Sequence, residues 1–400
     1  MKALLINEVC GIGSHGRICT DLAQLLTSQG HQCKIAYGRD GYVPEPYRKY
    51  AMRIGTDFDV RLHGLRTRIL DSTGFGSRRA TERFIESVKK FDPDIIHLHN
   101  LHGYYVNIEV LFSYLVSTGK PVIWTLHDCW AFTGHCAHFD YVNCEKWKTH
   151  CAACPNKGEY PKSLLLDRSY RNFEDKKRLF TSVKNMTIVT PSNWLAGMVR
   201  QSFLNKYPVV VIHNGIDLSV FKPTPSDFRL RHGLEGKRIV LAVASTWDKR
   251  KGYDDLIKLS SLLDEIHQLV IVGLSEKQKK ALPGNVIGIL RTNNVTELAA
   301  LYSTADVLVN PTYEDNFPTV NLEALACGTP VITYDTGGSP ECIDEMTGIV
   351  LKEKSLHSFL PAIAMAQKLL RTDCVGWVRA FDKAERFQEY HEIYKAMECM

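Results

Sequence analysis

Long apolar runs are missing from this sequence. No stretch of about eighteen uncharged apolar residues occurs anywhere in its 400 residues, so no segment has the length and composition of a transmembrane helix. The apolar part of the start, MKALLINEVC, is also too short for a secretory signal. We therefore expect a cytoplasmic protein.

A large excess of one charge is missing as well. The 49 Lys and Arg residues are nearly matched by 44 Asp and Glu, which leaves a formal net charge of +5. This charge is too small to predict nucleic-acid binding, although it suits a phosphate-bearing substrate or an anionic lipid. The hydrophobic content of 44% is ordinary for a globular protein, and the length favours two domains of roughly 200 residues over one core.

Cysteine, in contrast, is frequent for an intracellular chain, with twelve residues. Seven of them are scattered, and we expect them to act as small buried hydrophobic residues: Cys10, Cys19, Cys33, Cys327, Cys342, Cys374 and Cys399. The other five lie in one segment, residues 129–161, which looks like an insertion.

Four of those clustered cysteines, Cys136, Cys144, Cys151 and Cys154, have the spacing of possible metal ligands, and His135, His138 and His150 are near them in sequence. Four thiolates on a long loop favour a structural zinc ion that would stiffen the insertion. The spacing matches no standard zinc finger. A redox-labile pair, a disulfide, or thiols packed against Trp130 and Trp147 therefore remain open.

Buried strands alternate with helical segments along nearly the whole chain. Strands are expected at residues 2–7, 32–37, 94–99, 121–126, 186–190 and 209–213, and again at 238–244, 268–272, 286–289, 307–310 and 331–334. A helix is expected from Leu164 to Ser182. The pattern predicts an α/β protein with two doubly wound, Rossmann-like parallel sheets, and we place the domains at residues 1–222 and 223–375, with residues 376–400 as a helix that returns to the first domain.

The stretch PTYEDNFPTVNLEALACGTP, residues 311–330, lies between two of these strands. Pro318 suits the first turn of a helix that starts at Thr319, and Gly328 suits its C-terminal cap. A loop at the carboxyl end of a parallel strand, followed by the unpaired amides of a helix start, favours a phosphate. Two carboxylates, Asp315 and Glu323, flank this helix start.

The same stretch, EDNFPTVNLEALACGTPVI, resembles the signature of the family-four retaining glycosyltransferases of the GT-B fold, in which an acidic residue, seven others and a Glu follow one another. Asp315 and Glu323 take these two positions, although most relatives have Glu at the first. The resemblance implies two domains that face a central cleft. It also implies that Asp315 and residues 316–319 (Asn316, Phe317, Pro318 and Thr319) lie at the donor sugar and phosphates, and that Glu323 binds the ribose.

Further positions extend the resemblance. It makes Lys251, in DKRKG, the donor-phosphate lysine, but Ser245 replaces the arginine that the family has six residues earlier, and Arg250 could compensate. It places Gly16 at the donor phosphates, Arg291 at the nucleobase, and His127 near the donor sugar and acceptor. Three other histidines lie near the end of the expected strand 94–99 and are weighed with His127: His97, His99 and His102.

Residues 61–90 are basic and have apolar residues at helical spacing. Such a region can lie on an anionic membrane surface, in which case the enzyme would sit on the inner face of the cytoplasmic membrane. More often it is the solvated face of helices, and both interpretations stay open.

Together these residues predict a retaining glycosyltransferase that moves a sugar from a UDP- or GDP-sugar to a glycan or lipid-linked acceptor in cell-surface polysaccharide biosynthesis. The expected catalytic residues are His127, Lys251 and Asp315. No metal is expected for catalysis, because Lys251 and Arg250 can stabilise the departing diphosphate.

Three alternatives remain. One is a sugar-nucleotide epimerase or hydrolase of the same fold. The second is a non-catalytic sugar-nucleotide-binding protein, which Ser245 favours. The third is a nicotinamide oxidoreductase that uses the glycine loop of residues 11–16; against it, Arg39 stands where an acidic residue is expected.

Overall fold

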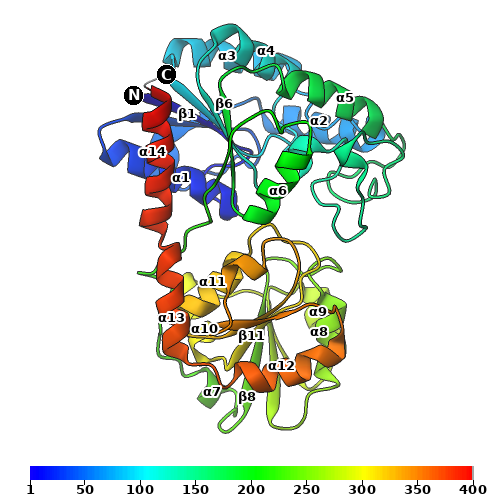
Figure 1. Cartoon of the computed structure of the whole chain (residues 1–400), viewed down its shortest axis with the longest axis vertical. Coiled ribbons are helices and arrows are strands. Elements are labelled where there is room, and N and C mark those ends of the chain that lie inside the picture. The colour runs from blue at the N-terminus through cyan, green and yellow to red at the C-terminus, as the bar shows by residue number, and fades with distance from the viewer. Residues whose placement is uncertain (399–400) are drawn as a thin grey trace. The chain divides into compact units, whose positions relative to one another are not determined.

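The computed structural model describes residues 1–398 and divides into two compact units. The first unit contains residues 1–212 together with 387–398, and the second contains residues 213–386 (Figure 1). Residues 213–222, which the sequence analysis placed in the first domain, therefore lie in the second unit. Cys399 lies outside the described residues, whereas the other six scattered cysteines are buried, as predicted.

The first unit is built on a seven-stranded parallel sheet in the order β3-β2-β1-β4-β5-β6-β7. Its strands are β1 (Lys2–Ile6), β2 (Gln32–Tyr37), β3 (Ala51–Arg53), β4 (Ile95–Leu98), β5 (Val122–Thr125), β6 (Met186–Thr190) and β7 (Val209–Val211). Its helices are α1 (Gly13–Ser28), α2 (Asp57–Leu70), α3 (Arg78–Phe91), α4 (Ile108–Thr118), α5 (Ser169–Phe180) and α6 (Asn193–Gln201).

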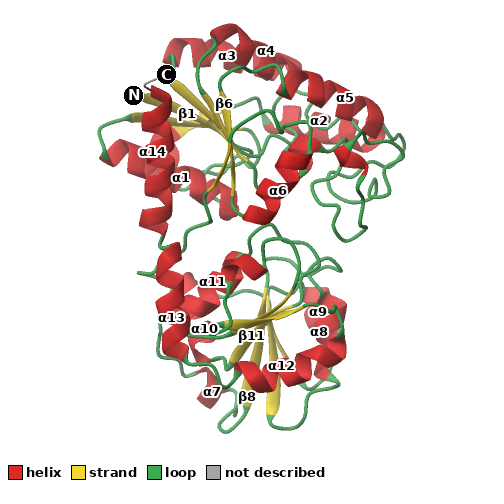
Figure 2. Cartoon of the chain, viewed as in Figure 1, coloured by secondary structure: helices red, strands yellow, loops and turns green. Residues whose placement is uncertain are grey.

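Alternating side chains of these strands enter two cores, one on each face of the sheet. Leu4, Ile6 and Ile96 pack on the side of α3, α4 and α5, while Ala3 and Leu5 pack on the side of α1. The second core also receives Phe387, Tyr390 and Tyr394 of α14 (Lys383–Glu398), the helix that links the two units. Figure 2 shows helices on both faces of the sheet.

The second unit repeats this plan with a six-stranded parallel sheet in the order β10-β9-β8-β11-β12-β13. Its strands are β8 (Arg238–Val243), β9 (His267–Val272), β10 (Val286–Ile289), β11 (Val307–Asn310), β12 (Val331–Tyr334) and β13 (Gly348–Leu351). The helices are α7 (Phe228–Arg231), α8 (Tyr253–Ser260), α9 (Glu276–Lys280), α10 (Val295–Thr304), α11 (Thr319–Ala326), α12 (Phe359–Ala366) and α13 (Arg371–Trp377). Two parallel sheets confirm the predicted fold class.

Each sheet has one point where the strand order reverses, between β1 and β4 in the first unit and between β8 and β11 in the second. The loops that leave neighbouring strands at such a point diverge to opposite faces of the sheet, which opens a crevice at the carboxyl ends of the strands. Ligands of open α/β sheets bind there, so these two edges are the places to look for a site.

One segment differs from the sequence prediction, and a second belongs to the basic region of residues 61–90. The helix expected from Leu164 begins only at Ser169, because residues 164–166 instead extend along α2, with Leu164 N donating to Arg68 O at 2.7 Å. In α3 the apolar residues Phe84, Ile85 and Val88 are buried, so its basic residues form the solvated face of an ordinary surface helix.

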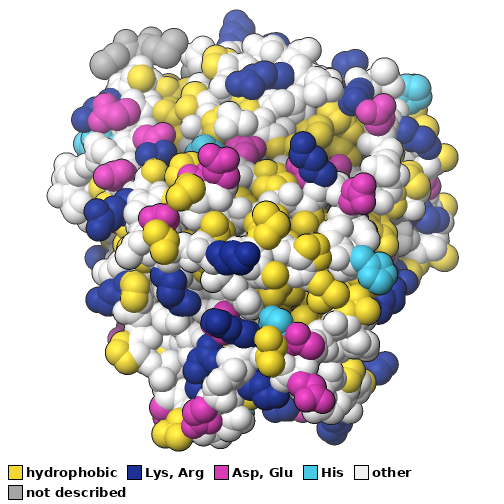
Figure 3. Space-filling view, turned by 60° about the horizontal axis from the view of Figure 1, so that its bottom comes forward, with side chains coloured by type: hydrophobic (Ala, Val, Ile, Leu, Met, Phe, Trp, Pro, Cys, Tyr) yellow, Lys and Arg dark blue, Asp and Glu magenta, His cyan; other side chains and the backbone are white. Residues whose placement is uncertain are grey.

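No helix within residues 1–398 combines the length and apolarity that crossing a bilayer requires. Figure 3 shows Lys and Arg side chains interspersed with Asp, Glu and hydrophobic side chains on the face that it presents.

Candidate active site

The loops after β8 and β11, at the reversal point of the second sheet, bring Lys251 and Asp315 together. Lys251 Nζ lies 2.5 Å from Asp315 Oδ2, and both side chains are partly exposed. The two loops are also joined through Arg250, whose Nη1 donates to Glu314 O at 3.1 Å and whose carbonyl accepts from Tyr313 N at 2.8 Å. Residues 64 positions apart thus form one charged edge, as the resemblance implied for Lys251, Arg250 and Asp315.

Two glycines permit this close approach. Gly252 has a φ of +75°, and a Cβ there would stand 2.1 Å from Pro311 O. Gly337, in the loop after β12, has a φ of +56°, and a Cβ there would stand 1.9 Å from Asp315 O. Only glycine fits either position, because both the conformation and the space exclude a side chain. The sequence did not predict these two close contacts, although K-G and G-G after a strand indicate turns.

The first turn of α11 points its backbone amides toward the same edge. Its N-cap is Pro318, no side chain caps the helix, and its first turn holds no acidic residue. Asp315 Oδ1 accepts from Phe317 N at 3.3 Å, which orders the loop, while Asn316, Phe317 and Pro318 are buried. An uncapped helix start beside a lysine is suited to an anion, because unpaired amides and the helix dipole both favour negative charge.

Glu323 lies one turn further along α11, where its Oε2 accepts a hydrogen bond from Tyr302 OH at 2.8 Å. Ser245 is exposed in the loop after β8, so it occupies the same edge without contributing a charge. Arg291 is exposed after β10, the outermost strand, and β9 separates that strand from β8. Of the predicted donor residues in the second unit, Arg291 is therefore the one set apart by an intervening strand, and Gly16 lies in the first unit.

His213 and Glu341 form an ion-pair contact that the sequence analysis did not single out. His213 Nε2 lies 3.3 Å from Glu341 Oε2, and the His213 ring packs on Phe317 with 4.9 Å between centroids. This packing holds the chain immediately before α11. The signal in the sequence was the turn GGSPE after β12, which ends in Glu341.

In the first unit, Gly16 and His127 lie at the corresponding edge. Gly16 is buried in the first turn of α1, and its carbonyl accepts from Gly11 N at 3.2 Å. His127, after β5, contacts His99 Nδ1 through Nε2 at 3.0 Å, and its ring centroid is 6.0 Å from that of His15 in α1. Burial lowers the pKa of His127 to about 3 and that of His99 well below its usual range, so both rings are neutral near pH 7.

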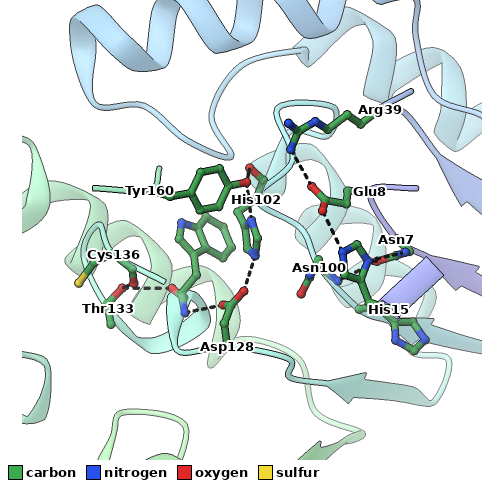
Figure 4. Close-up of polar contacts among 12 residues, drawn as sticks. Asn7, Glu8, His15, Arg39, Asn100, His102, Asp128, Thr133, Cys136 and Tyr160 are labelled. Atoms are coloured by element: carbon green, nitrogen blue, oxygen red, sulfur yellow. Dashed lines mark hydrogen bonds and ion pairs between the residues drawn. The ribbon is translucent and has the colours of Figure 1, made fainter. Parts of the chain in front are cut away.

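A chain of buried charges adjoins these histidines (Figure 4). Glu8 lies between His15 Nε2 at 3.1 Å and Arg39 Nη1 at 3.4 Å. Burial opposes ionisation of Glu8, but the hydrogen bond with His15 and the nearby cations outweigh it and lower its pKa to about 2. Glu8 thus stays a carboxylate, and Arg39 is engaged with it.

His102 forms a second, separate set of contacts, with Asp128 and Tyr160 (Figure 4). Its Nε2 lies 2.7 Å from Asp128 Oδ2, and its Nδ1 lies 3.0 Å from Tyr160 OH. Burial by itself would lower the pKa of His102, but the Asp128 carboxylate outweighs burial and raises it. Tyr160 belongs to the cysteine-rich insertion, so this contact fixes the insertion to the edge of the first sheet.

The four clustered cysteines line one small cavity together with Trp147 and His135. Cys151 Sγ accepts from Gly134 N at 3.2 Å, and a hydrogen bond between the Cys136 and Cys154 thiols lowers the pKa of Cys154 to about 7. Within residues 1–398, no three His, Cys, Asp or Glu side chains stand in an arrangement that could hold a metal ion. The structure thus adds no support for zinc binding by the four cysteines, and the zinc site stays a prediction.

Comparison with known proteins decides the family. Residues 15–220 match the family described as Glycosyltransferase Family 4, and residues 226–372 match Glycosyl transferases group 1. The first match alone covers more than half of the chain. The chain belongs to glycosyltransferase family 4. The enzyme is thus a transferase of the GT-B fold, as predicted, and the nicotinamide oxidoreductase interpretation is set aside.

One curated relative and several solved structures of the same fold match this glycosyltransferase over nearly its full length. The putative colanic acid biosynthesis glycosyl transferase WcaC of Escherichia coli K12 is 27% identical over 99% of this chain and 100% of its own. Sucrose-phosphate synthase from Thermosynechococcus elongatus shares the fold with a TM-score of 0.71 at 18% identity, over 99% and 98% of the two chains. Anabaena HepE in complex with UDP-glucose shares it with a TM-score of 0.65 at 14% identity, over 99% and 100%.

Proposed function

We propose that this glycosyltransferase moves a sugar, with retention of its anomeric configuration, from a UDP- or GDP-sugar to a hydroxyl of a glycan or lipid-linked acceptor in cell-surface polysaccharide biosynthesis. The observation that carries the proposal is the Lys251–Asp315 pair beside the uncapped start of α11. The full-length similarity to a putative colanic acid biosynthesis transferase supports the pathway, and the fold shared with a UDP-glucose complex supports the donor class.

In this proposal the donor diphosphate binds at the charged edge of the second unit. Lys251, Arg250 and the backbone N–H groups of Asn316 and Thr319 face the phosphates, and Asp315 accepts hydrogen bonds from hydroxyls of the sugar. Without donor, Asp315 partly neutralises Lys251; a diphosphate adds negative charge that Lys251 and the helix amides can share. Because these groups are already in place, they stabilise the departing diphosphate without reorganisation. No catalytic metal is needed for that role.

Glu323 and Arg291 are assigned to the nucleoside. The Glu323 carboxylate accepts hydrogen bonds from the ribose hydroxyls, while Tyr302 OH donates to Glu323 Oε2 at 2.8 Å and holds the carboxylate in place. Arg291 is exposed, and we assign it to the base only if the donor extends along the edge from β11 to β10. The Gly16 turn, with its backbone in the first turn of α1, is assigned to the phosphates from the first unit.

The transfer step is proposed as attack on the face that the diphosphate leaves, with the departing phosphate oxygen accepting the proton of the acceptor hydroxyl. His127 is neutral, so it can position a sugar hydroxyl by a hydrogen bond but supplies no positive charge.

All eleven cysteines within residues 1–398 are thiols, which is compatible with the cytosolic location that we propose.

A donor screen tests the proposal. Thermal unfolding is measured with UDP-, GDP- and ADP-sugars for the wild type, Lys251→Ala, Glu323→Ala and Lys249→Ala. Lys249 is the matched control, since it is an exposed lysine of the same loop. We expect stabilisation by one donor class that disappears in the first two variants and persists in the third. Equal stabilisation of Lys251→Ala would refute the proposed donor site.

A second candidate, a protein that binds sugar nucleotides without turnover, is favoured by Ser245 in place of the family arginine. Donor binding without transfer to any acceptor, and without release of free sugar, would support it. Release of free sugar or an epimer from donor alone would instead indicate the hydrolase or epimerase.

A further inference from the structure

The rings of His99 and His127 meet nitrogen to nitrogen. His99 Nδ1 lies 3.0 Å from His127 Nε2, while the two ring centroids are 5.3 Å apart and the ring planes differ by 12°. The centroids are further apart than the nitrogens, so both nitrogens lie between the two ring centres and point toward each other in nearly parallel planes. This geometry is that of a hydrogen bond in which one ring donates and the other accepts.

Two arrangements of the protons satisfy this hydrogen bond. Burial lowers the pKa of both histidines, so each ring is neutral near pH 7 and carries a single N–H group. In the first arrangement, His99 donates from Nδ1, its Nε2 is a bare acceptor, and the proton of His127 is on Nδ1. In the second arrangement, His127 donates from Nε2, and the proton of His99 is on its own Nε2.

The surroundings of His99 Nε2 distinguish these arrangements. His99 is 1% exposed, and its Nε2 has no hydrogen-bond partner among residues 1–398. The ring of His97 packs on His99 with 4.1 Å between centroids. Both nitrogens of His97 already face hydroxyl groups, Nδ1 at 2.5 Å from Tyr394 OH and Nε2 at 2.7 Å from Thr125 Oγ1. A proton on His99 Nε2 would therefore be a buried donor without an acceptor.

A buried donor without an acceptor is the less favourable of the two outcomes. Such N–H groups are rare in folded proteins, whereas acceptors with an unused lone pair are more common. The first arrangement leaves only a lone pair unused at His99 Nε2. The backbone holds His99 in place for it, since His99 N donates to Ile6 O at 2.9 Å and His99 O accepts from Trp124 Nε1 at 3.1 Å.

We propose that His99 is a positioning residue that fixes His127 as the Nδ1–H tautomer. The lone pair of His127 Nε2 is occupied by the N–H group of His99 Nδ1, so the other ring nitrogen of His127 is a donor. The partner of one imidazole nitrogen sets the position of the proton on the other. Because free histidine in water favours the Nε2–H tautomer, this contact selects the less common form.

The consequence for the reaction rests on the proposed function. There His127 donates a hydrogen bond from Nδ1 to a sugar oxygen, and it has no free lone pair to accept the proton of the acceptor hydroxyl. As the bond from the sugar to the diphosphate breaks and the bond to the acceptor oxygen forms, the proton therefore goes to the departing phosphate oxygen. His99 is fully buried and acts only through His127.

Nitrogen-15 NMR of the full chain, labelled at the histidine ring nitrogens and without donor or acceptor, tests the tautomer. Two-bond proton–nitrogen correlations at pH 7.5 distinguish a protonated ring nitrogen from a bare one, and His127→Gln identifies the His127 signals by their loss. We expect the Nδ1–H tautomer for both His127 and His99. An Nε2–H tautomer of His127, or averaged signals from both forms, would overturn the proposal.

Substitutions at His99 test the cause. His99→Leu removes the donor, and we expect His127 to shift to the Nε2–H form. His99→Asn places an amide N–H group near the position of Nδ1 and should keep His127 in the Nδ1–H form. An unchanged tautomer in His99→Leu, or loss of the Nδ1–H form in His99→Asn, would overturn the role of His99.

His97→Gln is the matched control, because His97 packs on the same ring while its own nitrogens contact hydroxyl groups. It should leave the tautomer of His127 unchanged. A shift as complete as that in His99→Leu would assign the effect to ring packing and overturn the proposal.

A double-mutant cycle tests the consequence for turnover, with the donor that the thermal screen selects. Release of nucleoside diphosphate is measured for the wild type, His99→Leu, His127→Gln and the double variant. We expect His99→Leu to lower kcat by about 10- to 100-fold. The double variant should stay within about twofold of His127→Gln, because His99 acts only through His127. Losses that multiply in the double variant would show an independent role for His99 and overturn the proposal.

The two readouts separate this inference from the proposed function. If the wild type releases no nucleoside diphosphate from any donor, the proposed function fails, while the NMR tautomer of His127 still confirms or overturns the role of His99. The wild-type spectrum needs no substitution at His99, so it decides the tautomer even where a variant fails to fold.

Discussion

Lys251 Nζ lies 2.5 Å from Asp315 Oδ2 although the two residues are 64 positions apart in the chain. The contact exists because β8 and β11 are neighbours at the reversal point of the second sheet, and each residue lies in the loop that follows its strand. The pair places a cation and an acceptor of hydroxyl groups side by side, a combination suited to a phosphorylated sugar.

Replacing Lys251 tests the charge at this edge. Lys251→Ala should lower kcat/KM by roughly 10² to 10³, about 3 to 4 kcal/mol of transition-state stabilisation, because one fixed cation near the departing phosphate is lost. Lys249→Ala should keep kcat/KM within about twofold. The measurement is the initial rate of sugar transfer at several donor concentrations, and equal rates for the two variants would remove Lys251 from the site.

Gly252→Ala tests how the loop is held. Its Cβ would stand 2.1 Å from Pro311 O at a φ of +75°, so we expect a loss of about 1 to 3 kcal/mol in the free energy of unfolding and weaker donor binding. Gly376→Ala, within α13, meets nothing within 4 Å and should stabilise the chain by about 0.5 to 1 kcal/mol. Urea denaturation compares the two, and a neutral Gly252→Ala would contradict the packing described.

Buried neutral histidines should make the first unit sensitive to acid. Burial lowers the pKa of His63 to about 4 and that of His97 to about 3, so between those values and about pH 6.5 the unfolded chain binds more protons than the folded one. Each of these two histidines should therefore lower the free energy of unfolding by about 1.4 kcal/mol per pH unit as the pH falls below 6.5.

His102 changes the free energy of unfolding in the opposite direction. Because its pKa is raised in the folded chain, it stabilises the fold in acid, and this stabilisation is lost as the pH rises through the folded pKa. Urea denaturation at pH 7.5, 6.5 and 5.5 provides the slope. His97→Gln, which keeps polar contacts near Tyr394 OH and Thr125 Oγ1, should show a shallower dependence. A flat profile in the wild type would exclude protonation of these residues on unfolding.

Metal analysis tests the zinc prediction for Cys136, Cys144, Cys151 and Cys154. If these thiols close on an ion, chain purified without chelator should carry one zinc, and Cys144→Ser should lose it together with thermal stability. Cys129→Ser is the control, because Cys129 does not line the cavity. Metal-free chain with four reactive thiols in the insertion would favour the interpretation as packed free thiols.

Local sequence alone determined much of the donor half of the site. The apolar run Val307–Asn310, Pro318 before α11 and Gly328 after it act through neighbouring residues, so strand, loop and helix could be read in order. The short strand β3 was not predicted, since it is an edge strand of three partly exposed residues with no apolar run. The strand β13, also at an edge, was not predicted either, although its segment GIVL is apolar.

Only the tertiary structure decided which loops meet and which way α2 faces. Strand order depends on packing between distant segments, so the sequence around Gly252 and Gly337 marks two turns but does not show that both contact residues 311–315. The α2 pattern is helical in either orientation. In the folded chain His63 faces inward and accepts hydrogen bonds from two backbone N–H groups of the following loop. The opposite face of α2, with Phe58, Leu62, Leu65 and Ile69, is therefore at the surface.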